Sequence, residues 1–182
     1  GRSPLQRVQL PAQILGQIRP GRPEVGVALT KAVADAEAFV RDSATEALGE
    51  IGPEAAGAVT ALAARLEERH TSARDPVGHA LEQIGRPAVS ALAKVISGNS
   101  EPARDHALAV LTRIGPNALE AAPAIIAFVR REGELRASDA AFALGEMGPG
   151  VLPHVVPLLD GKTTLEKIVA AVGRRIDEAN PI

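Results

Sequence analysis

One short phrase, an apolar pair followed by glycine and then proline, occurs four times in this 182-residue chain. The copies occupy residues 48–53, 81–87, 111–116 and 144–149. Their glycines, at positions 52, 85, 115 and 148, are 33, 30 and 33 residues apart. A regular period of this length is typical of stacked supersecondary units, so the sequence predicts a repeat protein.

Each copy of the phrase predicts a corner between two helices. Leucine and the apolar residue three positions later, Leu48 and Ile51 in the first copy, lie on one helical face. The glycine is expected to adopt the left-handed conformation that ends a helix, and proline fits the first turn of the next one. All four glycines should therefore have positive φ. Replacing Gly115 with valine should cost about 1 kcal/mol or more, because a β-branched residue is strained there.

Between the corners, apolar residues at helical spacing predict a first helix (A) and a second helix (B) in every repeat. Asp75 is expected to cap the helix that begins at Pro76, and Ser100 the helix after it. No segment has the alternation of a strand. The expected pairs of A and B helices are 38–48 with 54–69, 73–81 with 89–96, 101–114 with 118–131, and 135–147 with 151–159.

The ends of the chain deviate from the pattern, as terminal repeats commonly do. We expect one domain over residues 1–182, with a degenerate N-terminal repeat (1–36), regular repeats (37–160) and a C-terminal capping helix (162–179). The expected fold is all-α, a right-handed α-solenoid of about five stacked helix pairs.

The residues around the first corner also carry a family resemblance. They read Val40-Arg41-x-x-Ala44-x-x-Ala47-Leu48-Gly49-x-Ile51-Gly52. This pattern resembles the core motif of HEAT-like repeats, in the short form named after phycobilisome lyases, and the likeness extends over about residues 38–159. The resemblance implies a non-catalytic scaffold that binds another protein. Because it includes the bilin lyases, a lyase-like chaperone subunit that handles a tetrapyrrole is the alternative.

Composition narrows the function classes. The chain has no cysteine, which excludes disulfides and a cysteine nucleophile and favours a reducing compartment such as the cytoplasm. Its formal charge of −2 gives no general reason to bind nucleic acid or an anionic membrane. No apolar run approaches the roughly 18 residues that span a bilayer. Two arginine pairs, at 130–131 and 174–175, keep a nucleic-acid binder as a weaker alternative.

Candidate chemical sites are sparse, so no enzyme activity, cofactor or metal is expected. His79 and His106 lie on adjacent A helices, about 8–10 Å apart with about 4.5 Å of axial offset, which prevents them from sharing one ion. In the HEAT-like deoxyhypusine hydroxylase, repeated His-Glu pairs hold two irons. Here the matching positions read Asp42-Ser43, Asp75-Pro76 and Asp105-His106. The chain starts at Gly1 without methionine, and we expect it to be part of a larger protein.

An Arg-Asp pair holds the same position in three consecutive A helices, at 41–42, 74–75 and 104–105. Repetition at the same position favours a structural role, since each helix must pack against its neighbours in the same way. We expect Asp42 to approach Arg74, and Asp75 to approach Arg104, across neighbouring repeats.

The B helices line the concave side in HEAT-like stacks, and their outward residues are the predicted partner-binding surface. Small side chains there would let a partner approach, and Lys94 and Arg131 would select acidic positions in it. Glu46 represents the opposite, convex side. The predicted surface consists of Thr60, Ala64, Lys94, Glu120, Ala124, Arg131 and His154.

Overall fold

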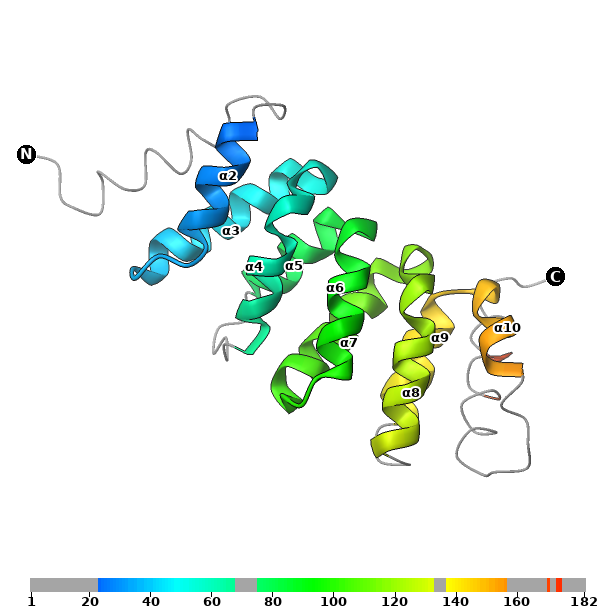
Figure 1. Cartoon of the computed structure of the whole chain (residues 1–182). Coiled ribbons are helices and arrows are strands. Elements are labelled where there is room, and N and C mark those ends of the chain that lie inside the picture. Colours follow the sequence, from blue (N-terminus) through cyan, green and yellow to red (C-terminus); the bar gives the residue numbers. More distant parts are fainter. Residues whose placement is uncertain (1–22, 68–74, 133–136, 157–169, 171–172, 175–182) are drawn as a thin grey trace, which may run out of the picture. The chain divides into compact units, whose positions relative to one another are not determined.

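A computed structural model describes residues 23–67, 75–132, 137–156, 170 and 173–174. Every regular element within these ranges is a helix, and the helices follow one another in pairs (Figure 1). The chain divides into two compact units, Gly1–Ala91 and Leu92–Ile182. The all-α fold of repeated helix pairs is thereby confirmed. Among the described helices, none has both the length and the apolar character that a bilayer crossing requires.

In the first unit, two A helices pack side by side, and a B segment covers them. Helix α3 packs against both α2 and α5, while α4 packs against α5. The elements are α2 (Pro23–Ala32), α3 (Ala38–Ile51), the 3-10 helix η1 (Gly52–Ala58), α4 (Val59–Ala64), the 3-10 helix η2 (Arg65–Glu67) and α5 (Pro76–Ile84). Helix α6 (Arg86–Ser97) continues the chain into the second unit.

The second unit repeats the arrangement with its own helices. Helix α7 packs against α9, and α8 packs against both α9 and α10. The elements are α7 (Glu101–Ile114), the 3-10 helix η3 (Gly115–Ala121), α8 (Ala122–Glu132), α9 (Ala137–Glu146), the 3-10 helix η5 (Pro149–Val151) and α10 (Leu152–Val155). Residues 1–22 of the expected degenerate N-terminal repeat lie outside the described residues. Of the expected capping helix, only residues 170, 173 and 174 are described, as helical.

The repeated leucine of each corner is the centre of the core. Leu48, Leu81, Leu111 and Leu144 are all fully buried, with no exposed surface. Apolar residues of the B segments, such as Leu62 in α4, are buried beside them. Most of this core consists of aliphatic side chains and alanine, and Phe128, one of the three phenylalanines of the chain, is buried with them.

The four corner glycines adopt the predicted positive φ, between 63° and 76°. The predicted left-handed helical conformation is wrong in ψ. The ψ angles are −140°, −131°, −131° and −168° at Gly52, Gly85, Gly115 and Gly148. Positive φ with strongly negative ψ is a region that glycine alone occupies readily. The corner therefore requires glycine more strictly than a left-handed helical cap would.

Helices α4, α8 and α10 begin later than predicted, because a 3-10 segment follows three of the four corners, whereas α6 (Arg86–Ser97) is longer than the expected helix over 89–96. The expected helix over 54–69 begins as η1, where Ala55 has φ −79° and ψ 16°, and becomes α-helical only at Val59. Similarly, η3 precedes α8, which has Pro123 in its first turn. A proline near each start and a 3-10 turn between the corner and the α-helix explain the shift.

The predicted caps differ in outcome. The Asp75 carboxylate accepts a hydrogen bond from the Gly78 backbone N–H at 2.8 Å, as expected for the residue that begins α5. Ser100 occupies the N-cap position of α7, but its side chain makes no capping hydrogen bond. The fold of α7 therefore relies on packing and on the proline of its first turn, Pro102, rather than on this cap.

Candidate functional site: a groove between two A helices

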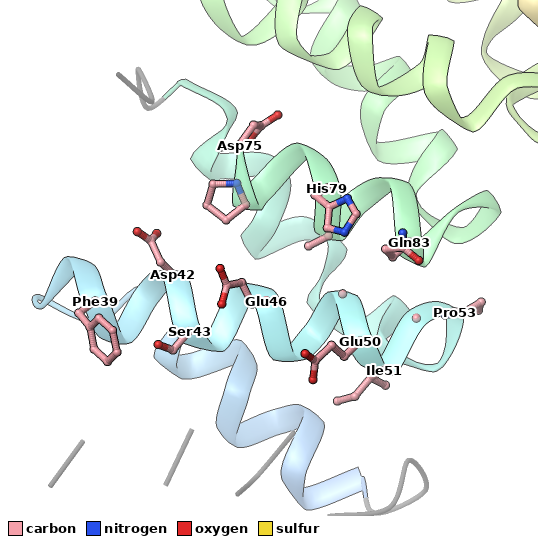
Figure 2. A pocket seen from close by; sticks show the side chains of 14 residues that line it. Phe39, Asp42, Ser43, Glu46, Glu50, Ile51, Pro53, Asp75, His79 and Gln83 are labelled. Carbon is pink, nitrogen blue, oxygen red and sulfur yellow. The ribbon is translucent and has the colours of Figure 1, made fainter. Parts of the chain in front are cut away.

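A groove of about 1260 Å³ lies between α3 and α5 in the first unit. Figure 2 shows the two helices running in the same direction, with Asp42 and Glu46 of α3 pointing toward α5. The lining residues are Phe39, Asp42, Ser43, Glu46, Gly49, Glu50, Ile51, Gly52, Pro53, Asp75, Pro76, His79, Ala80 and Gln83.

Two rows of polar side chains form the banks of the groove. Each row occupies the same three positions relative to the repeated leucine: six residues before it, two before it and two after it. Residues four apart lie on one face of a helix, one turn above each other. The rows are Asp42, Glu46 and Glu50 on α3, and Asp75, His79 and Gln83 on α5.

Small residues form the floor between these rows. A Cβ atom added to Gly49 would lie 3.0 Å from the Ala80 Cα and 3.3 Å from its Cβ. A side chain at position 49 would therefore force the two helices apart. Glycine and alanine bring the helix backbones close together, and the longer side chains of the banks rise on either side.

The electrostatics of the groove are negative. Its lining, as far as the structure describes it, contains four carboxylates and no lysine or arginine. Among these carboxylates, Asp42 is paired with Arg65, whose guanidinium lies 2.9 Å from Asp42 Oδ1. Arg65 is only 6% exposed, and it also donates to Thr45 Oγ1 at 2.7 Å. Asp75 is engaged as the cap of α5.

Three groups of the groove remain open to a ligand. The side chains of Glu50, His79 and Gln83 make no hydrogen bond or ion pair with the described part of the chain. Glu50, His79 and Gln83 are all exposed. Together they offer a carboxylate, an imidazole and an amide that both donates and accepts.

The residues of the predicted partner-binding surface belong to both units. Thr60 and Ala64 lie on α4 of the first unit. The remaining five residues lie in the second unit: Lys94 on α6, Glu120 on η3, Ala124 and Arg131 on α8, and His154 on α10. Ala124 is half-buried and the other six residues are exposed. Their accessibility agrees with the prediction, and their docking role stays a proposal.

Arg131 has a structural task that the sequence prediction missed. Its guanidinium donates to the Ser97, Ile96 and Gly98 carbonyl oxygens at 3.2, 3.4 and 3.3 Å, at the end of α6. It also pairs with Glu132 at 3.0 Å. A cation that satisfies the last carbonyls of a helix stabilises that end. Arg131 therefore contributes to the fold, and its expected role in selecting an acidic partner stays a proposal.

The repeated Arg-Asp pairs make contacts within their own repeat. Arg41 donates to the Asp35 carbonyl oxygen at 3.0 Å, and Arg104 donates to the Gly98 carbonyl oxygen at 3.2 Å, in each case six residues earlier. Arg104 also lies 3.5 Å from Glu132. In each of these two repeats, the arginine thus bonds to a carbonyl oxygen of the loop that precedes helix A.

The expected ladder between neighbouring repeats stays a prediction, because Asp75 and Arg104 belong to different units. Within its own unit, Arg104 contacts Gly98 and Glu132. Asp42 pairs with Arg65 of its own repeat, and Arg74, its expected partner, lies outside the described residues. A helix and the loop that precedes it are covalently close, so this pairing costs less chain entropy than one between repeats.

The described residues contain no group of three or more histidine, aspartate or glutamate side chains that could hold a metal ion. His79 lies in the groove, while His106 belongs to α7 of the second unit. The groove offers polar contacts from two helices. A surface of this kind suits the binding of an elongated polypeptide.

The fold and the groove define an all-α helical-repeat protein with a polar interhelical surface. No family model matches the chain, and no curated protein sequence matches it. A designed armadillo repeat protein in complex with the peptide (KR)4 is 19% identical over 96% of this chain and 95% of its own, with a TM-score of 0.47. An engineered protein (17% identity, 94% and 91% coverage) has a TM-score of 0.45. A second designed armadillo repeat protein (19% identity, 96% of each chain) has a TM-score of 0.43.

Sequence reasoning treated Asp42, Asp75 and Glu46 as structural or convex-side residues and assigned no role to Glu50 or Gln83. A signal was present nonetheless. The same three outward positions read Asp-Glu-Glu in one repeat and Asp-His-Gln in the next, whereas after α6 they read Asp105, Ala109 and Arg113. Packing does not constrain these positions, so such differences point to a surface that is specific to the first unit.

Proposed function

We propose that this chain is a non-catalytic scaffold of HEAT-like repeats that binds another protein, and that residues 1–182 form one repeat domain. The observation that carries the proposal is the α3–α5 groove, whose banks come from two successive repeats. Such a surface contacts an elongated partner at several points. Glu50, His79 and Gln83 are available to that partner because no described residue engages their side chains.

Burial supports a binding role over a catalytic one. Most of the large aliphatic side chains are buried in the core, and the repeated leucines are fully buried. Two of the groove's four carboxylates already serve the fold, Asp42 with Arg65 and Asp75 as a cap. The groove thus presents dispersed polar contacts of the sort found at a protein interface. No described feature favours the bilin-lyase alternative over this reading.

The docking face is tested by site-specific photo-crosslinking. A photoreactive residue is placed at Gln83 in the groove or at Thr60 on the B-helix face of the same unit, both of them exposed. We expect a protein partner, captured from cells and then purified, to crosslink in stoichiometric amount from position 83 and weakly from position 60. Efficient crosslinking from position 60 alone would move the docking face to the B helices. Failure of both positions to capture a protein would contradict the scaffold function.

A further inference from the structure

The guanidinium groups of two arginines contact the connection between α6 and α7. Arg104, on α7, donates to the Gly98 carbonyl oxygen at 3.2 Å, and Arg131, on α8, donates to the same oxygen at 3.3 Å. Within the described residues one carboxylate pairs with both arginines, since Glu132 Oε1 lies 3.5 Å from Arg104 and 3.0 Å from Arg131. Two positive charges therefore share one negative charge beside residues 98–100, the non-helical segment between the two helices.

The two guanidinium groups are held in place without a full set of acceptors. Both lie against the Phe128 ring, with Arg104 5.6 Å and Arg131 6.0 Å from its centroid. Arg104 is only 9% exposed, and its Nε has no hydrogen-bond partner in the part of the chain that the structure describes. Because buried donors are nearly always paired, the unpaired Nε indicates that this cluster lacks an acceptor.

The N-terminus of α7 lies beside the same segment. Ser100 is its N-cap residue and is half-buried, but its side chain makes no capping hydrogen bond, in contrast to Asp75 at the start of α5. The first N–H groups of a helix attract negative charge, and α7 has 14 residues. A phosphoryl group on Ser100 Oγ would lie at this helix end, two residues from the Gly98 carbonyl group that both arginines contact.

We propose that Ser100 is a phosphorylation site, and that its phosphate is held by Arg104, Arg131 and the N-terminus of α7. The serine hydroxyl oxygen attacks the terminal phosphorus of a nucleoside triphosphate bound to a protein kinase. The P–O bond to the nucleoside diphosphate breaks, and the hydroxyl proton passes to a base of the kinase. The phosphate then supplies strong acceptors to two guanidinium groups and a helix end. This inference goes beyond the scaffold function and does not depend on it.

The test installs phosphoserine at position 100 of the full chain during its synthesis and follows the phosphorus-31 NMR signal with pH. The second ionisation of free phosphoserine has a pKa of about 6. Nearby guanidinium groups favour the dianion, so the midpoint in the folded chain should be lower by about half a unit or more. The same phosphorylated chain unfolded in urea is the control. Equal midpoints in the folded and unfolded chains would overturn the proposal.

A matched pair of variants locates the phosphate. Arg131 and its neighbour Arg130 are both exposed, and Arg130 makes no hydrogen bond or ion pair with the described part of the chain. In the phosphorylated chain, Arg131→Met should reduce the midpoint shift by about half or more, while Arg130→Met should leave most of it, because screening weakens the more distant charge. Equal effects of the two variants would show a general charge effect without contact and overturn the proposal. Circular dichroism melting curves confirm that both variants remain folded.

Inorganic phosphate distinguishes a phosphorylated serine from a free anion. Titrated into the unmodified chain at concentrations up to about 10 mM, it should leave the Nε–H NMR signal of Arg131 in place, because a free anion must also lose its translational freedom on binding. Phosphoserine at position 100 should move that signal. Saturable movement with inorganic phosphate, and none with phosphoserine, would assign the cluster to a free anion and overturn the proposal.

Discussion

Replacement of Gly115 with alanine isolates the backbone conformation of the corner. Gly115 has φ 63° and ψ −131°, a region in which a residue with a Cβ atom is strained by about 1–3 kcal/mol. A Cβ atom at this position would lie 3.5 Å from the Glu146 carbonyl oxygen, an ordinary contact, so steric overlap with neighbours adds little. The predicted loss of stability is therefore about 1–3 kcal/mol, all of it from backbone strain.

The control is a glycine with an ordinary helical backbone. Gly26, in α2, has no heavy atom within 4 Å of an added Cβ, so Gly26→Ala should be stabilising by about 0.5–1 kcal/mol. For a chain of this length, about 2–4 °C of melting temperature corresponds to 1 kcal/mol. Thermal melting followed by far-UV circular dichroism should thus move in opposite directions for the two variants. Equal shifts, or no shift for Gly115→Ala, would refute the account of the corner.

Two further predictions concern arginines that the fold uses. Arg65→Met removes the donor to Asp42 and Thr45 from a buried position and should cost about 1–3 kcal/mol in urea unfolding; a cost below about 0.5 kcal/mol would show that the guanidinium contributes only packing. Arg131→Met removes the cap on α6 and should cost about 1 kcal/mol. Lys94→Glu, on an exposed side chain with no partner in the described residues, should stay within about 0.5 kcal/mol of the parent chain. If Lys94→Glu destabilises the protein as much as Arg131→Met does, the assignment of the cap is wrong.

The corners show how far sequence reasoning carries the fold. Glycine before proline at a fixed period predicted the positive φ at Gly52 and its equivalents, because few other residues tolerate it. The ψ value was not predictable, since it depends on the 3-10 turn that follows. That turn arises from proline at the start of the segment and from Ala55 leaving helical geometry, which propensity alone does not specify.

The contacts of charged side chains were less predictable. The Arg-Asp register was visible in the sequence, and its structural role is confirmed by the hydrogen bonds of Arg41 and Arg104. The partners that the structure describes were not predicted, because periodicity shows which residues are equivalent and does not show which of them touch. Carbonyl oxygens of a nearby loop or helix end are acceptors that no sequence pattern marks.

The groove was missed for a related reason. Its banks occupy outward positions of the A helices, while the sequence argument followed the outward positions of the B helices. Only the packing of α3 against α5, across Gly49 and Ala80, brings Glu50 and Gln83 to the same recess. A comparison of equivalent outward positions between adjacent repeats would have indicated it.

The most direct test of the proposed docking face is an NMR titration of the isotope-labelled chain with the protein partner that crosslinking captures. The account predicts the largest shift changes at the Gln83 side-chain amide and the Gly49 backbone amide, which face the groove. It predicts little change at Thr60 and Ala64, on the exposed face of α4 in the same unit. Large changes at Thr60 and Ala64, with Gln83 and Gly49 unmoved, would contradict it.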